Sequence, residues 1–312
     1  MLRLALLLVM LAPQDVAWRT NWKETLAEAK KSNKLALLVF WNAGVKNWKQ
    51  FEADTLSDAN TKQQLGKFIC CKIDPEGTDD ENKLWQEHKS CSIPTTFVYD
   101  PEGKMLTTVT ALNTKIYWQA LAEATPAYFE KILPARQALA KDPNQPEKLA
   151  MLGDAYAKLN VPAESKSAYD KAAETAVAKG DKAGAIRILV QQLDQYYELG
   201  KMWYASTRTC AGKLIELDGS NSTKKCHLAA FVLCMADYSE AKWQEAIAGL
   251  RAATVKYPDN DLLDKMYLSL GAAHGYAKEY DKAREAYETV MKKFVGSDSA
   301  KLAEIQLGKL PK

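Results

Sequence analysis

Cysteine and histidine are the residue types through which this 312-residue chain could carry out reactive chemistry, and it has six of the first and three of the second. The histidines, His88, His227 and His274, lie far apart in the sequence, and no cluster of carboxylates surrounds them. None of the cysteine spacings is that of a metal-binding motif. We therefore expect neither a metal site nor a bound cofactor.

The cysteines differ in what their surroundings allow. Cys70 and Cys71 are neighbours in an apolar segment of strand length. Adjacent side chains of a strand point to opposite faces, so in a sheet covered on both faces each thiol is buried and inert. Cys91 is then the thiol of this half that could still react. The second half holds three more cysteines, of which two could form a disulfide: Cys210, Cys226 and Cys234.

The elements that would position these side chains alternate between strand and helix patterns. Residues 34–41 are an apolar run of strand length, and residues 46–56 have the spacing of a helix. The sequence Asp-Pro-Glu-Gly at residues 100–103 marks a turn. Three further strands and one helix complete this half: strands over residues 68–74, 93–99 and 105–110, and a helix over residues 79–89.

This order of strand, loop and helix resembles the thioredoxin family, and the likeness covers roughly residues 18–125. In that family the loop carries a reactive Cys-X-X-Cys, whose first cysteine lies at the helix N-terminus because the helix dipole stabilises a thiolate there. In this sequence the two cysteine positions hold Val45 and Trp48. The resemblance therefore implies the frame of a thioredoxin without its redox centre.

A second part of the resemblance concerns residues 93–99, which match the cis-proline strand of the family. The match implies a cis peptide bond before Pro94 and places Cys91 near the former active surface. It also implies a groove beside this proline that accepts an extended polypeptide. Trp48 should then lie on the first turn of its helix and either face inward or cover this groove.

The sequence becomes helical and repetitive after residue 126. One unit contains Leu149, Leu152, Gly153 and Tyr156, which resembles a tetratricopeptide repeat, two antiparallel helices in which a small residue lets the helices approach closely. The last unit repeats the pattern, a third has Cys234 in place of the glycine, and a fourth near residues 190–210 is weak. Residues 127–143 look like a half repeat that connects the two halves. The second half is therefore predicted to be an all-α solenoid.

Stacked repeats form a concave face from the first helix of each pair, and such faces hold peptides or partner helices. Projection of the repeat onto this sequence places an apolar centre on that face, with Phe231, Met235, Tyr238 and Tyr276. Aromatic residues and methionine are enriched at the centres of interfaces, so an apolar or helical protein segment is the expected partner. The alternative is that this face packs against the chain's own thioredoxin-like half.

The first residues have the pattern of an export signal. A positive start is followed by nine apolar residues, 4–12, and a short polar exit to residue 17. Nine residues are too few to span a bilayer, which takes about 20. The expected location is the periplasm or the exterior of a bacterial cell, with no membrane span after the signal is removed. The net charge of +3 is small and no basic stripe is present, so nucleic acid is not an expected partner.

Together these patterns predict a signal peptide at residues 1–17, an α/β thioredoxin-like domain at 18–125 with a central mixed sheet flanked by helices, and an all-α helical repeat domain at 126–312. The expected function is that of a non-catalytic adaptor or scaffold that binds a protein or peptide. Two alternatives stay open at this point. One is a thiol-disulfide oxidoreductase or thiol-linked carrier that uses Cys91, and the other is a periplasmic chaperone.

Overall fold

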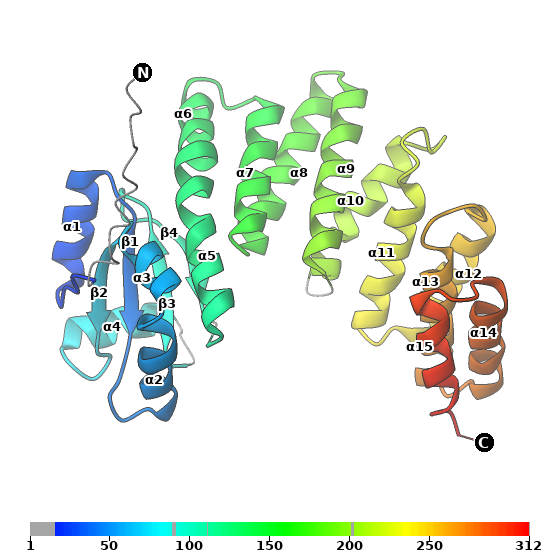
Figure 1. Cartoon of the computed structure of the whole chain (residues 1–312). Helices are drawn as coiled ribbons and strands as arrows, with labels where there is room; N and C mark the ends of the chain where they lie inside the picture. Colours follow the sequence, from blue (N-terminus) through cyan, green and yellow to red (C-terminus); the bar gives the residue numbers. More distant parts are fainter. Residues whose placement is uncertain (1–15, 89–91, 111, 201–202, 312) are drawn as a thin grey trace, which may run out of the picture. The chain divides into compact units, whose positions relative to one another are not determined.

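The computed structural model describes residues 16–88, 92–110, 112–200 and 203–311 (Figure 1). Residues 1–15 of the predicted signal peptide lie outside the described residues, and so does Cys91. The chain forms two compact units. Unit 1 contains the residues up to Gln137 together with Lys158–Val161, and unit 2 contains Ala138–Ala157 and the residues from Pro162 onward. Among the described residues, none of the helices has the length and apolar character that a membrane crossing requires.

Unit 1 is built on a sheet of four strands in the order β2-β1-β3-β4. Strand β1 pairs in parallel with β2 and antiparallel with β3, so the sheet is mixed. The central strand consists of five apolar residues that are all buried, as expected for a strand covered on both faces. These features confirm the predicted thioredoxin-like fold. The strands are β1 (Ala36–Phe40), β2 (Ile69–Ile73), β3 (Thr95–Tyr99) and β4 (Met105–Val109).

Helices flank this sheet. Helix α1 packs on β1 and β2, and α5 packs on α3 and β4. The predicted helix over residues 46–56 divides into α2, which ends at Phe51, and a π-helical turn, Glu52–Leu56. The side chain of Thr78 caps α4 in a capping box with Glu81, which explains why this helix begins where it does. The helices are α1 (Trp22–Ser32), α2 (Lys46–Phe51), α3 (Ala59–Leu65), α4 (Asp79–Glu87) and α5 (Thr114–Pro126).

A continuous helical segment follows, and the predicted domain boundary after residue 125 falls inside it. Helix α5 leads into a π-helical turn, Ala127–Ile132, and then into α6 (Leu133–Lys141). Tyr128 donates a hydrogen bond of 2.8 Å to Glu102, and Arg136 forms an ion pair of 2.7 Å with the fully buried Asp100. Both acceptors belong to the turn before β4. These contacts explain why unit 1 extends beyond residue 126.

Unit 2 is a series of packed helices, which confirms the predicted all-α repeat architecture (Figure 1). Consecutive helices contact each other, and one apolar core runs from Leu149 to Ala286. Helix α15 packs on α13 and α14 and completes the series. The helices are α7 (Pro146–Lys158), α8 (Pro162–Ala178), α9 (Lys182–Leu199), α10 (Tyr204–Leu217), α11 (Cys226–Ser239), α12 (Trp243–Lys256), α13 (Leu263–Tyr276), α14 (Tyr280–Lys293) and α15 (Asp298–Leu307).

Small residues let paired helices approach, as the repeat pattern predicts. A Cβ atom added at Gly271 of α13 would lie 2.6 Å from the ring of Tyr287 on α14, which is closer than side chains can pack. Gly153 and Tyr169 form the same pair between α7 and α8. In the third pair the sizes are exchanged, because Cys234 of α11 faces Gly249 of α12, where an added Cβ would lie 2.6 Å from the sulfur. The unusual cysteine is thus accommodated by a glycine on the opposite helix.

Candidate partner-binding site

The loop at the former redox position carries no side chain that could exchange a disulfide. Val45 occupies the N-cap position of α2, but its side chain cannot accept a hydrogen bond from the helix. The loop before it is held by Asn42, whose side-chain oxygen accepts a bond of 2.8 Å from the N–H of Gly44. The strand, loop and helix therefore keep their geometry with an aliphatic side chain at the helix N-terminus.

Trp48 lies in the first turn of α2 and points into the core, with an exposed fraction of 2%. Its ring centroid is 5.7 Å from that of Trp41 and 5.9 Å from that of Phe51, and Phe51 in turn meets the buried Tyr117 edge-on at 5.0 Å. The ammonium of Lys72 lies 5.1 Å from the centroid of the indole ring. Of the two predicted orientations, the structure has the inward one. Trp48 is thus a packing residue.

The peptide bond between Ile93 and Pro94 is cis, as the resemblance implies. Pro94 is buried and directly precedes β3. Cys91, the predicted reactive thiol, lies outside the described residues, so its surroundings stay a prediction.

The other five cysteines are free and buried. Burial raises the pKa of Cys70 to about 12 and that of Cys71 to about 11. It also raises the pKa of Cys210 and Cys234 to about 12, and that of Cys226 in the same direction. A raised pKa keeps these thiols protonated, and the nucleophile in disulfide exchange is the thiolate. The open question of a disulfide among the three cysteines of unit 2 is resolved in favour of free thiols.

A pocket of about 710 Å³ lies in unit 2 and brings the predicted partner-binding residues together. Its lining comes from α9, α10, α11, α13, α14, α15 and the residues after α15. The four predicted residues, Phe231, Met235, Tyr238 and Tyr276, all line it. Pockets of this size with mainly apolar and aromatic linings are typical ligand sites.

The four residues differ in how far they are exposed. Phe231 is only 5% exposed, because Tyr197 packs against it with ring centroids 6.5 Å apart. Met235 and Tyr238 are half-buried, whereas Tyr276 is 62% exposed. Phe231 therefore does not belong to an exposed surface patch. This residue is buried in the lining, while Tyr276 is available to a partner.

An aromatic cluster borders the pocket and includes a residue that the sequence did not single out for binding. The rings of Trp243 and Tyr276 are stacked at 4.8 Å with an interplanar angle of 15°. Tyr238 meets Trp243 edge-on at 5.1 Å and Tyr276 at 5.7 Å. Trp243 begins α12, and in the repeat pattern its position is one of packing. Only the exposure of its neighbour Tyr276 identifies this cluster as a surface feature.

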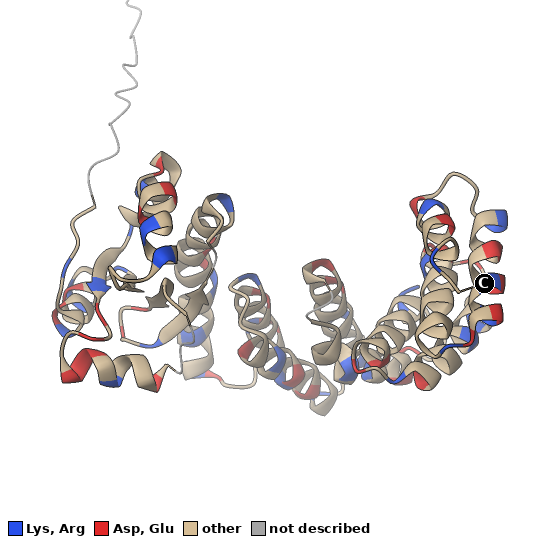
Figure 2. Cartoon of the chain, turned by 90° about the horizontal axis from the view of Figure 1, so that it is seen from below, with Lys and Arg blue, Asp and Glu red and all other residues tan. Residues whose placement is uncertain are grey.

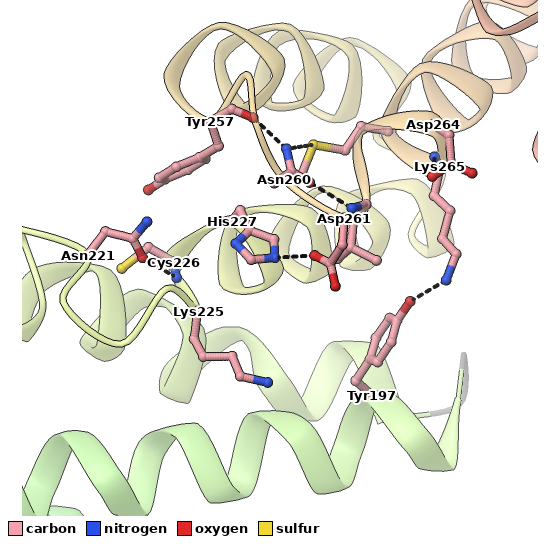
Figure 3. Close-up of polar contacts among 12 residues, drawn as sticks. Tyr197, Asn221, Lys225, Cys226, His227, Tyr257, Asn260, Asp261, Asp264 and Lys265 are labelled. Carbon is pink, nitrogen blue, oxygen red and sulfur yellow. Dashed lines mark hydrogen bonds and ion pairs between the residues drawn. The ribbon is translucent and has the colours of Figure 1, made fainter. Parts of the chain in front are cut away.

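Polar contacts join the first helices of neighbouring repeats beside the pocket (Figure 3). His227 at the start of α11 contacts Asp261 before α13, with 2.8 Å between Nε2 and Oδ1. Lys265 of α13 donates a bond of 3.2 Å to the hydroxyl of Tyr197 on α9. The ring of Tyr197, which accepts this bond, also packs against Phe231 of α11. The repeats therefore hold one another at this end of the pocket.

Charge is otherwise mixed along the helices, as the interspersed blue and red segments of Figure 2 show. Among the described residues, no group of three or more His, Cys, Asp and Glu side chains is placed to hold a metal ion. The arrangement in unit 2 can therefore bind apolar side chains, with hydroxyl and ammonium groups at its edges. Burial raises the pKa of Tyr287 in the lining to about 12, so its hydroxyl stays protonated at neutral pH.

Comparisons with family models and with curated proteins give no match for this chain. Among solved structures, a thioredoxin from Thermus thermophilus is similar at 15% identity and a TM-score of 0.33, over 36% of this chain and 88% of that chain. A disulphide isomerase from Xylella fastidiosa Temecula1 is similar at 23% identity and a TM-score of 0.30, over 33% and 87%. The Cut9-Hcn1 hetero-tetramer of the APC/C is similar at 13% identity and a TM-score of 0.30, over 63% and 43%. At these identities the likeness concerns the fold alone.

Proposed function

We propose that this protein is a non-catalytic adaptor of the bacterial envelope, which binds a protein partner through the pocket of unit 2. The observation that carries the proposal is the convergence of Met235, Tyr238 and Tyr276 on one pocket of about 710 Å³. Aromatic residues and methionine are enriched at the centres of protein interfaces. The export pattern of the first residues supports the location.

Unit 1 supports the non-catalytic part of the proposal. The helix N-terminus that would activate a thiol carries Val45, and the position of a second thiol is filled by the buried Trp48. The five described thiols are protonated because burial raises the pKa of each of them. In this proposal unit 1 is a folded module without disulfide exchange, and unit 2 provides the binding pocket.

Selection of peptides from a random 14-residue display library on the immobilised full chain tests the proposal. We expect a family of peptides rich in apolar residues. One synthetic member should bind the double variant Met235→Ala/Tyr276→Ala at least tenfold more weakly than the wild type, which corresponds to about 1.4 kcal/mol. Fluorescence anisotropy gives the affinities, and circular dichroism shows whether the variants are folded.

The matched control is Val255→Ala, because Val255 is 81% exposed on α12 and does not line the pocket. This variant should bind like the wild type. A selection that enriches no peptide, or a peptide that binds the double variant and the wild type equally, would contradict the proposal.

A further inference from the structure

The pocket of unit 2 carries positive charge that the described residues do not neutralise. Its lining has three charged side chains, Lys265, Asp298 and Lys309. Asp298 is paired with Lys301 at 3.1 Å, although both are exposed. Within the described residues, the ammonium of Lys265 donates to the neutral hydroxyl of Tyr197, whose ring also lies 5.8 Å from the ammonium. The backbone N–H of Lys265, not its ammonium, donates to the carboxylate of Asp264. Among the described residues neither Lys265 nor Lys309 has a carboxylate within ion-pair distance.

Some other lysines of the same unit do form ion pairs. Lys166 is paired with Asp170 at 2.5 Å, Lys213 with Glu174 at 2.8 Å, and Lys225 with Asp194 at 2.6 Å. These pairs lie on the helices or between neighbouring repeats. The two pocket lysines are exposed cations in the lining of a mainly apolar cavity, and among the described residues no carboxylate lies within ion-pair distance of either.

The two lysines lie near opposite ends of α13. Lys265 belongs to its first turn. At its last turn, Gly275 lies beside Leu310, the residue after Lys309, since a Cβ added at Gly275 would be 3.7 Å from a methyl carbon of Leu310. With a rise of about 1.5 Å per residue, these ends of α13 are about 15 Å apart. Between them the lining includes Met235 and Leu268.

We infer that the partner segment has apolar anchors flanked on both sides by carboxylate groups about 15 Å apart, one for each pocket lysine. This inference rests on the proposed function, because it names the chemistry of the partner for the same pocket. In a helical segment the spacing corresponds to about ten residues, and in an extended one to about five. A peptide with acidic residues on both sides of its anchors places a negative charge at each end of the pocket. A single-chain lipid carries its charge at one end only, so it would leave one lysine unpaired.

A carboxylate of the partner would replace the hydroxyl of Tyr197 as the acceptor of the Lys265 ammonium. A carboxylate bonds an ammonium more strongly than a neutral hydroxyl does, because the hydrogen bond is then assisted by charge on both groups. The chain gives up only the contact with Tyr197. Part of the affinity must therefore depend on ionic strength, since exposed charges are screened by salt.

The display selection described above also tests this inference, because the sequences of the enriched peptides show where their charged residues lie. The wild type should enrich peptides in which Asp or Glu flanks an apolar centre on both sides. The double variant Lys265→Glu/Lys309→Glu should enrich Lys or Arg at those positions. Each single reversal should change the preference at one side only. A synthetic peptide from the wild-type selection should bind the double variant at least tenfold more weakly.

The matched control is Lys171→Glu/Lys292→Glu, which changes the net charge by the same amount on exposed residues outside the pocket lining. It should retain the acidic preference. Enriched apolar peptides without a charge preference, or the same preference in both double variants, would overturn this inference and leave the proposed function standing. Displacement of such uncharged peptides by oleate would overturn it in favour of a lipid carboxylate. A selection that enriches nothing would refute the proposed function itself.

Discussion

The loop that ends at Val45 and the pocket around Met235 both have aromatic neighbours, but the rings are arranged differently. In unit 1, Trp48 is 2% exposed and forms a chain of ring contacts with Trp41 and Phe51. In unit 2, Tyr276 is 62% exposed beside a cavity of about 710 Å³. The comparison shows that an aromatic residue at a position of functional interest can complete a core or remain available to a ligand. The distinction depends on neighbours that lie far away in the sequence.

The largest expected effect concerns Trp48. Because its ring is enclosed, Trp48→Ala should lower the free energy of unfolding of unit 1 by about 3–5 kcal/mol. Urea denaturation of the full chain followed by circular dichroism measures the change. Lys49→Ala is the control, since Lys49 is exposed on the same helix and its loss should change stability by less than about 0.5 kcal/mol. A stable Trp48→Ala protein that no longer binds its partner would show that Trp48 is a binding residue and not a packing residue.

A smaller effect is expected where helices of unit 2 approach each other. Gly271→Ala places a methyl group against the ring of Tyr287 and should destabilise the chain by about 1–3 kcal/mol. Gly212→Ala on α10 meets nothing within 4 Å and should stabilise it by about 0.5–1 kcal/mol, since alanine favours a helix over glycine. Thermal unfolding of both variants gives the comparison. Equal shifts in the same direction would show that these helices are not packed as closely as the structure has them.

A weaker effect is expected from acid. Burial lowers the pKa of His274, which contacts Glu279 at 2.6 Å and Arg251 at 3.2 Å, and it also lowers the pKa of His88 in unit 1. In the unfolded chain these histidines take up protons near the ordinary histidine pKa of about 6.5, whereas in the folded chain they do so only at lower pH. Stability should therefore fall as the pH decreases below that value.

The urea midpoint measured from pH 8 to pH 5 shows this decline. The substitution His274→Gln should make this decline with falling pH smaller than His88→Gln does, because His274 is 1% exposed and His88 is half-buried. A midpoint that rises as the pH falls would contradict the lowered pKa of both histidines.

No effect at all is expected in a disulfide reductase assay. With Val45 and Trp48 at the redox positions, the reduction of insulin by dithiothreitol should proceed as it does without the protein. Activity that disappears in Cys91→Ala would contradict the non-catalytic proposal and favour the alternative of a thiol oxidoreductase.

Much of the fold could be predicted because its signals are local. The predicted positions of the four strands agree with the structure within a few residues. The cis bond before Pro94 agrees with the resemblance. The division of the helix after Phe51 by a π-helical turn was not predictable, because it has no signal in the apolar spacing. The same holds for the helix that continues past Pro126, which depends on long-range contacts such as Arg136 to Asp100.

The sequence by itself determined which chemistry is missing from the redox loop and which residue types lie on the first helices of the repeats. These follow from identity and spacing, which folding does not change. Only the tertiary structure decided that Trp48 is enclosed, that Phe231 is covered by Tyr197, and that Tyr276 stays exposed. It also decided that Lys265 and Lys309 line one pocket and that, among the described residues, neither has a carboxylate within ion-pair distance. Burial and ion pairing are properties of groups brought together from distant parts of the chain, so a local pattern does not contain them.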